Sequence, residues 1–104
     1  MNNFYTVPSA LLQSNDKKMI MMINDEEKIF TIDTRFSTYE KILAALEAGQ
    51  IKKSIELAIG VKAVKEIEKM DLTFEGYMTI VKTIQAAITG IAPEKVDDFF
   101  RNNQ

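Results

Sequence analysis

The chain has 104 residues, of which 46% are hydrophobic, and a formal net charge of −2 at neutral pH. This length is typical of one independently folding domain, and the hydrophobic content is too high for a disordered chain. The near balance of 13 basic and 15 acidic residues creates no strong field toward nucleic acid or an anionic membrane, so we expect neither as a partner.

Residues 1–16 mix apolar side chains with Asn, Pro and Ser, and we expect a partly ordered segment there. They lack the basic head and the long apolar stretch of a signal peptide. No run in the sequence approaches the roughly 20 apolar residues that a membrane-spanning helix needs. We therefore expect a cytoplasmic protein.

The clearest pattern in the chain is a β-hairpin. Met19–Ile23 is apolar at every position, and the polar residues Asn24–Glu27 suit a turn. Lys28–Ile32 follows as a half-buried strand, with Phe30 and Ile32 on one side. A strand that is apolar throughout is buried on both faces or offers its second face to a partner, and both interpretations stay open for Met19–Ile23.

A helix is predicted directly after the hairpin. Ser37 to Glu40 matches the capping box, in which a hydroxyl caps the helix start and a glutamate further along bonds back. Gly49 supplies a C-terminal stop. The apolar face of this helix consists of Tyr39, Ile42, Leu43 and Leu46.

Residues 51–70 predict two short helices that meet near Gly60. Apolar side chains recur at helical spacing through this stretch, and the glycine interrupts them. These apolar residues are Ile51, Ile55, Ile59, Val64 and Ile67. A third strand over residues 61–69 is the alternative, although polar and apolar residues do not alternate well there.

Two more helices are predicted toward the end of the sequence. Thr73 can cap a helix that begins at Phe74, and Gly90 follows as its stop. Pro93 suits the first position of a final short helix, where its missing N–H does no harm. The apolar stripe of the first helix consists of Phe74, Tyr77, Met78, Val81, Ile84 and Ile88, and that of the second of Val96, Phe99 and Phe100.

The predicted fold class is therefore α+β, an N-terminal two-stranded β-hairpin packed against three to five short helices. A hairpin of two strands is not stable alone in water, so either the helices must cover it or a second chain must extend it. We expect a single domain over residues 1–104, in which residues 17–49 form the hairpin and its helix and residues 50–104 are helical.

The composition excludes much of enzyme chemistry. The chain contains no cysteine, no histidine and no tryptophan, so it offers no thiol nucleophile, no histidine base and no Cys/His metal site. The acidic turn Asp25–Glu27 lacks the glycine and the ligand spacing of a calcium loop. No glycine-rich phosphate loop is present. We expect no catalytic residue, no metal and no cofactor, and hence no enzyme.

The candidate contact residues for a protein partner are methionines and phenylalanines. Methionine adapts to irregular surfaces and is common at binding sites, although it also fills cores. Adjacent aromatic residues on a helix cannot both face one narrow seam, so one of the two can dock internally while the other meets a partner. The candidates are Met19, Met21, Met22, Phe99 and Phe100.

Lysines give a second candidate site. Residues 25–50 carry six acidic and three basic residues, whereas residues 51–72 carry four acidic and five basic ones. A mixed lysine face of this kind is usually a solvated helix surface. Under an alternative in which the protein sequesters a nucleotide signal between subunits, the phosphate-facing residues would be Lys52, Lys53, Lys62 and Lys65.

Residues 19–57 combine a short apolar strand, a polar turn, a strand ending in Asp, and a helix running into Ala-Leu-x-x-Gly. The residues that carry this pattern are Ile20–Ile23, Asn24–Glu27, Phe30, Ile32, Asp33, Tyr39, Ile42, Leu43, Ala45, Leu46 and Gly49. The pattern resembles a small domain of phage-encoded proteins of the rIIB-like type. Residues 72–100, a helix leading into a short acidic and aromatic one, are similar to small phage tail-assembly chaperones.

Both resemblances imply a phage origin and the cytoplasm of the host. We expect a non-enzymatic interaction protein, a phage accessory factor that binds a host or phage protein and forms a homo-oligomer through the open edge of the hairpin. A tail-assembly chaperone, which would bind an aggregation-prone partner through its helices, is one alternative. The oligomeric protein that sequesters a nucleotide is the other.

Overall fold

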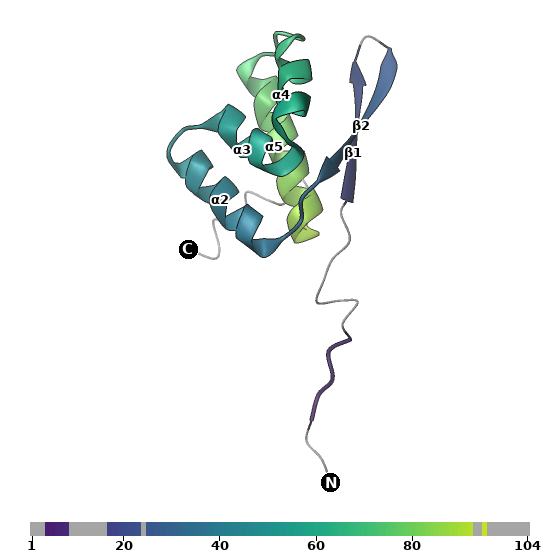
Figure 1. Ribbon diagram of the computed structural model, residues 1–104, viewed down its shortest axis with the longest axis vertical. Coiled ribbons are helices and arrows are strands. Elements are labelled where there is room, and N and C mark those ends of the chain that lie inside the picture. Colours follow the sequence, from purple (N-terminus) through teal and green to yellow (C-terminus); the bar gives the residue numbers. More distant parts are fainter. Residues whose placement is uncertain (1–3, 9–16, 24, 93–94, 96–104) are drawn as a thin grey trace.

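The computed structural model describes residues 4–8, 17–23, 25–92 and 95. Within them the chain forms one antiparallel β-hairpin followed by four α-helices, so the predicted α+β class is confirmed. Figure 1 shows the hairpin standing beside the helices, while residues 4–8 run away from both. No helix in this described part of the chain is long and apolar enough to cross a membrane. The predicted final helix, with Phe99 and Phe100, lies outside the described residues.

The hairpin consists of β1 (Lys17–Ile23) and β2 (Glu26–Ile32). Its turn is shorter than predicted, because Ile23 pairs directly with Glu26 and the predicted turn residues Glu26 and Glu27 belong to β2. Asp25 has a φ of +64°, in the left-handed region that such short hairpin turns require and that Asp tolerates. The short turn fixes the register of the two strands.

Helix α2 (Phe36–Glu47) begins one residue before the predicted cap Ser37, so the capping-box prediction is wrong. The residue before the helix is Arg35, whose own side chain makes no capping bond. The physical reason is that the Asp33 carboxylate accepts the Arg35 N–H at 3.1 Å and starts the helix earlier. Glu40 is exposed and takes no part in the cap. At the other end, Gly49 has a φ of +76°, as expected for a helix stop.

Helices α3 (Ile51–Ile59) and α4 (Val61–Glu68) meet at Gly60, so the prediction of two short helices is confirmed and the alternative third strand is wrong. Gly60 has φ +98° and ψ 162°, a combination that residues with a Cβ atom rarely adopt. Its N–H donates to the Glu56 carbonyl at 2.8 Å, which closes the last turn of α3. The glycine thus permits the sharp change of direction between the two helices.

We expect Gly60→Ala to lower the free energy of unfolding by about 1–2 kcal/mol, because alanine is strained in this backbone conformation. The space around the added Cβ atom is open, so the cost comes from the backbone and not from a steric contact. Urea denaturation of the two proteins measures the difference. Equal stability of the variant and the parent would contradict the described geometry at Gly60.

Helix α5 (Phe74–Thr89) begins and ends as predicted. The Thr73 side chain accepts the Gly76 N–H at 3.1 Å, and Gly90, at φ +74°, donates its N–H to the Ala86 carbonyl. The predicted stripe is wrong at one end, since Phe74 is 70% exposed at the first position of the helix. The buried residues of α5 are Ile80, Val81, Ile84 and Gln85.

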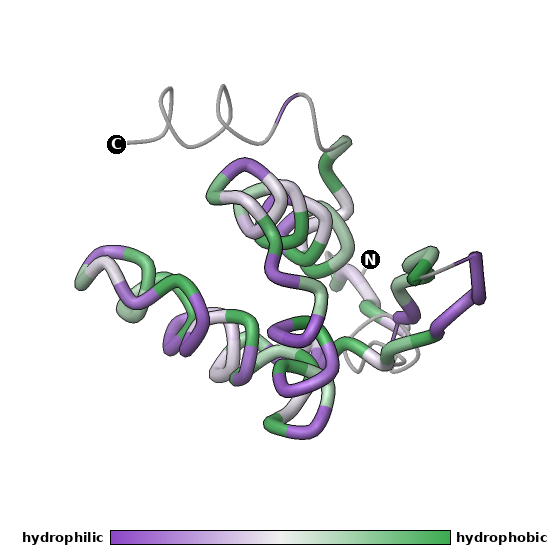
Figure 2. Tube along the Cα trace, turned by 90° about the horizontal axis from the view of Figure 1, so that it is seen from above, coloured by the Kyte–Doolittle hydropathy of each residue, from purple (hydrophilic) through white to green (hydrophobic). Residues whose placement is uncertain are grey.

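The hydrophobic core lies between the inner face of the hairpin and the helices. The hairpin packs against α5 and α3, and α3 also contacts α2, α4 and α5. The largest side chains with almost no exposed surface come from β2 and from all four helices, and they are Ile32, Ile42, Ile55, Ile67 and Ile84. Hydrophobic and hydrophilic residues alternate along the elements, as they do when each element buries one side (Figure 2).

Candidate protein-binding site

The outer face of the hairpin carries three exposed apolar side chains. Alternate residues of a strand face opposite sides, and Phe30 and Ile32 face the helices, where they are buried. Residues of the other parity face outward: Ile20, Met22 and Ile29 are 59%, 62% and 58% exposed. Ile20 and Ile29 are paired across the two strands, so their side chains are neighbours. We call Ile20, Met22 and Ile29 the hairpin surface.

A groove of about 330 Å³ lies next to the hairpin surface, between β1 and α5. On the strand side it is lined by four consecutive residues, Met19 to Met22. Because consecutive residues face opposite sides of a strand, a groove that touches all four runs along the edge of β1. Among the described residues β1 pairs only with β2, so this edge has no strand neighbour. We call this hollow the edge groove.

The helix side of the edge groove contains three small residues of α5. It is lined by Gly76, Thr79 and Thr83, together with Ile80 and Leu72. The hydroxyls of Thr79 and Thr83 donate to backbone carbonyls of their own helix, each at 2.8 Å. None of the described residues that line the groove is charged. An uncharged hollow beside an unpaired strand edge is suited to an extended apolar segment.

The three candidate methionines of β1 do not share one face. Met19 is buried in the core, Met21 is partly buried against it, and Met22 is exposed on the hairpin surface. All three nevertheless line the edge groove. The structure therefore places them together along one edge, whereas the candidates Phe99 and Phe100 lie outside the described residues.

Ile20 and Ile29 were absent from the sequence-based candidates, although the sequence contains the signal for them. Once Phe30 and Ile32 are assigned to the core, the period of two in a strand turns Ile29 outward. The pairing register then places Ile20 opposite Ile29. Selecting candidates by residue type, with methionine preferred for its adaptability, missed both isoleucines.

Other hollows on the described surface contain charged groups. One of about 550 Å³ between the hairpin end and α4 is lined by two acids and two lysines, whose charges balance. A hollow of about 410 Å³ contains Asp33 and Arg35, and one of about 340 Å³ contains Lys41 and Lys53. The first hollow is lined by Ile23, Glu26, Lys28, Glu66, Lys69 and Met70. Acids and bases balance in the first two hollows. The third is lined by two lysines and no described acid, and the Lys53 ammonium there is paired with Glu56 at 3.2 Å.

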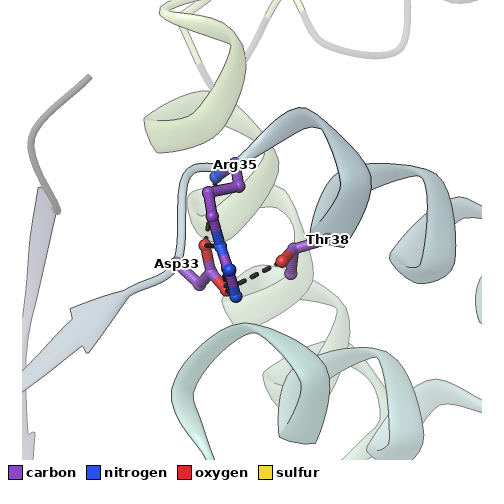
Figure 3. A network of polar contacts seen from close by, with 3 residues as sticks. All are labelled: Asp33, Arg35 and Thr38. Carbon is purple, nitrogen blue, oxygen red and sulfur yellow. Dashed lines mark hydrogen bonds and ion pairs between the residues drawn. The ribbon is translucent and has the colours of Figure 1, made fainter. Parts of the chain in front are cut away.

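The polar network of Asp33, Arg35 and Thr38 holds the connection between β2 and α2 (Figure 3). Asp33 accepts hydrogen bonds from the Arg35 side chain, the shortest at 2.7 Å, and from the Thr38 hydroxyl at 2.7 Å. Its own N–H donates to the Ala58 carbonyl at the end of α3, at 2.9 Å. Hydrogen bonding to the Arg35 guanidinium holds the pKa of Asp33 well below its usual range, although partial burial opposes the shift. These contacts explain Asp33 as a structural residue.

The four candidate phosphate-binding lysines are not gathered in one hollow. Lys52 donates to Glu68 at 3.2 Å and lies over the Tyr77 ring, and the hydrogen bond with Glu68 raises the pKa of Lys52. Lys53 donates to Glu56 at 3.2 Å. Lys62 and Lys65 are exposed on α4. Two of the four charges are thus already paired with carboxylates at the surface.

The hydroxyl of Tyr39, on α2, is buried and has the Gln85 side chain of α5 as a neighbour. Burial disfavours the phenolate and raises the pKa of Tyr39, while the neighbouring Gln85 side chain acts in the opposite direction. Among the described residues, no group of three or more acidic side chains lies close enough to hold a metal ion.

Comparison of this chain with protein-family models, with curated protein sequences and with solved structures gives no match. The fold and the surface described above are therefore the basis for the function proposed below.

Proposed function

We propose that this chain is a non-enzymatic interaction protein that binds another protein molecule through the hairpin. The observation that carries the proposal is the pairing of Ile20 with Ile29 on the outer face, each more than half exposed. Met22 lies on the same face, and the uncharged edge groove continues this apolar area along β1. Neighbouring exposed apolar residues on a small sheet are typical of protein contact surfaces.

The chemistry of the hairpin surface defines the kind of partner. Its three side chains are apolar. The neighbouring residues on the same face are polar: Lys18 and Thr31 form the next pair along the strands, and Glu27 lies opposite Met22. An apolar centre with a polar rim is the usual composition of a protein–protein interface. The partner is therefore expected to present an apolar patch with polar groups around it.

We further propose that the partner is a host or phage protein. This part is supported only by the sequence resemblance of residues 19–57 and 72–100 to small phage proteins. The chaperone alternative would use apolar residues on the helices. The described helices have three large exposed apolar residues, and each lies on a different helix: Phe36 on α2, Val61 on α4 and Phe74 on α5. The hairpin surface is therefore better supported as the place of contact.

Ile29→Lys tests the hairpin surface, because Ile29 lies on the outer face but does not line the edge groove. We expect this variant to capture at least about tenfold less partner than the parent protein from the cells that produce it, since a buried charge opposes an apolar contact. Quantitative mass spectrometry after affinity capture measures the difference. Val61→Lys, at a residue 50% exposed on α4, is the matched control.

Two results would reject the proposal. One is that no protein is captured by both the parent and the Val61→Lys control and lost by the Ile29→Lys variant. The other is that the same partner binds equally well to all three. Urea denaturation of each variant checks the fold, and we expect stabilities within about 0.5 kcal/mol of the parent because both positions are exposed.

A further inference from the structure

We infer that the edge groove binds residues Phe4–Pro8 of a second copy of this chain, which add a third strand to the hairpin. The inference rests on the proposed function, because it names the occupant of the hairpin's free edge. Residues Phe4–Pro8 are called the arm below. Two chains would exchange their arms reciprocally.

The arm is the most exposed apolar segment that the structure describes. Phe4 and Tyr5 are 84% and 96% exposed, and Val7 is 58% exposed. Aromatic and β-branched residues favour strands, and the sequence Phe-Tyr-Thr-Val-Pro contains no charge. Figure 1 shows that the arm extends away from the hairpin and the helices of its own chain. An apolar segment of this kind is suited to contact with another molecule.

The edge groove matches the arm in chemistry and in shape. The unpaired edge of β1 presents backbone N–H and C=O groups to which an extended segment can bond. Gly76, Thr79 and Thr83 leave room for a strand to lie on α5. The arm and the described lining of the groove contain no charged side chain, whereas the other hollows described above do. The arm therefore binds there without burying an unpaired charge.

Both faces of the added strand find apolar neighbours. Successive residues of a strand alternate, so Phe4 and Thr6 share one side while Tyr5 and Val7 share the other. One side packs on α5, and the other extends the hairpin surface beside Ile20. Pro8 lacks an N–H but stands at the end of the arm, where proline is tolerated in a strand.

The arm can reach a second molecule, and reciprocal exchange of two arms gives a closed dimer. Eight residues, 9–16, separate the arm from β1, and at about 3.3 Å per residue they span up to about 26 Å. Because arm and groove belong to the same chain, each of two copies can fill the groove of the other, which gives a closed twofold dimer. A net charge of only −2 per chain produces little repulsion between the copies.

Sedimentation velocity of the full chain over a range of concentrations tests the exchange. We expect the parent to form a dimer, and the arm variant Phe4→Ser/Tyr5→Ser and the groove variant Thr79→Arg each to raise the dimer dissociation constant at least about tenfold. Phe36→Ser and Ser37→Arg make comparable changes at exposed positions of α2. These two control variants should leave the dimer dissociation constant unchanged. A parent that stays monomeric, or an arm variant that dimerises like the parent, would overturn the exchange.

Cysteine cross-linking shows which chain supplies the arm. The chain contains no cysteine, so Val7→Cys and Thr79→Cys introduce unique thiols. When the two variants carry different tags and are mixed and oxidised, we expect a covalent heterodimer. With both substitutions in one chain, a disulfide formed within the monomer would overturn exchange between copies.

The outcomes also separate this inference from the proposed function. If the arm variant dimerises normally while Ile29→Lys loses the captured partner, the exchange is rejected and the hairpin surface stands. If Ile29→Lys captures the partner like the parent, the proposed function itself fails.

Discussion

We expect Ile32→Ala to lower the free energy of unfolding by about 2–5 kcal/mol, the range for a buried isoleucine truncated to alanine. Ile32 has no exposed surface and lies at the end of β2, where the hairpin joins the helices. Removing its side chain leaves a cavity in the hydrophobic core that the packed neighbours fill only in part. Urea or thermal denaturation measures the loss.

Ile29→Ala is the matched control for this prediction. It removes the same atoms from the same strand, but Ile29 is 58% exposed on the outer face. We expect a change within about 0.5 kcal/mol, as for most surface substitutions. A large loss at Ile29, or a small one at Ile32, would mean that the hairpin packs on the helices with its other face.

The second large effect is expected at Asp33. Asp33→Ala removes the acceptor for the Arg35 N–H at the start of α2 and for the hydroxyl of Thr38, which is only 7% exposed. Loss of the hydrogen bond from the Arg35 N–H and an unsatisfied buried hydroxyl together predict a loss of about 2 kcal/mol in the free energy of unfolding. Glu40→Ala, which would matter if the capping box existed, should change stability by less than about 0.5 kcal/mol.

The contribution of Asp33 should depend on pH. The Arg35 guanidinium makes the pKa of Asp33 lower in the folded protein than in the unfolded chain, so the folded state binds fewer protons. The stabilisation is therefore complete above the unfolded-state value of about 3.9 and is lost as the pH falls below it. We expect the difference in unfolding free energy between the parent and Asp33→Ala to be smaller at about pH 3 than at about pH 6. A constant difference would contradict the role assigned to the carboxylate.

The sequence predicted those elements of the fold that local patterns determine. Gly60 marks the junction of α3 and α4, and Thr73 caps α5, because each effect depends on a few neighbouring residues. The start of α2 was predicted wrongly because the Ser37–Glu40 pattern competes with the Asp33 carboxylate. The orientation of Asp33 is fixed partly by its backbone bond to Ala58 on α3, a contact that no local pattern contains.

The candidate site was only partly predictable for a similar reason. The apolar run of β1 allowed two interpretations, burial on both faces or an exposed second face. The structure buries Met19 and exposes Ile20 and Met22, which favours the second. The period of a strand could have indicated Ile29 from sequence. The edge groove could not be predicted, because it depends on how α5 lies relative to β1.

The central claim is that the free edge of β1 in the hairpin binds a second copy of this chain. Amide hydrogen exchange of the unmodified chain, compared between dilute and concentrated solution, tests it most directly, because exchange reports where backbone N–H groups become protected. We predict that protection in Lys17–Ile23 rises with concentration, since the free edge of β1 gains a strand, while α2 exchanges at the same rate in both solutions. Identical exchange of β1 at both concentrations, or protection that rises on α2 instead, would contradict the claim.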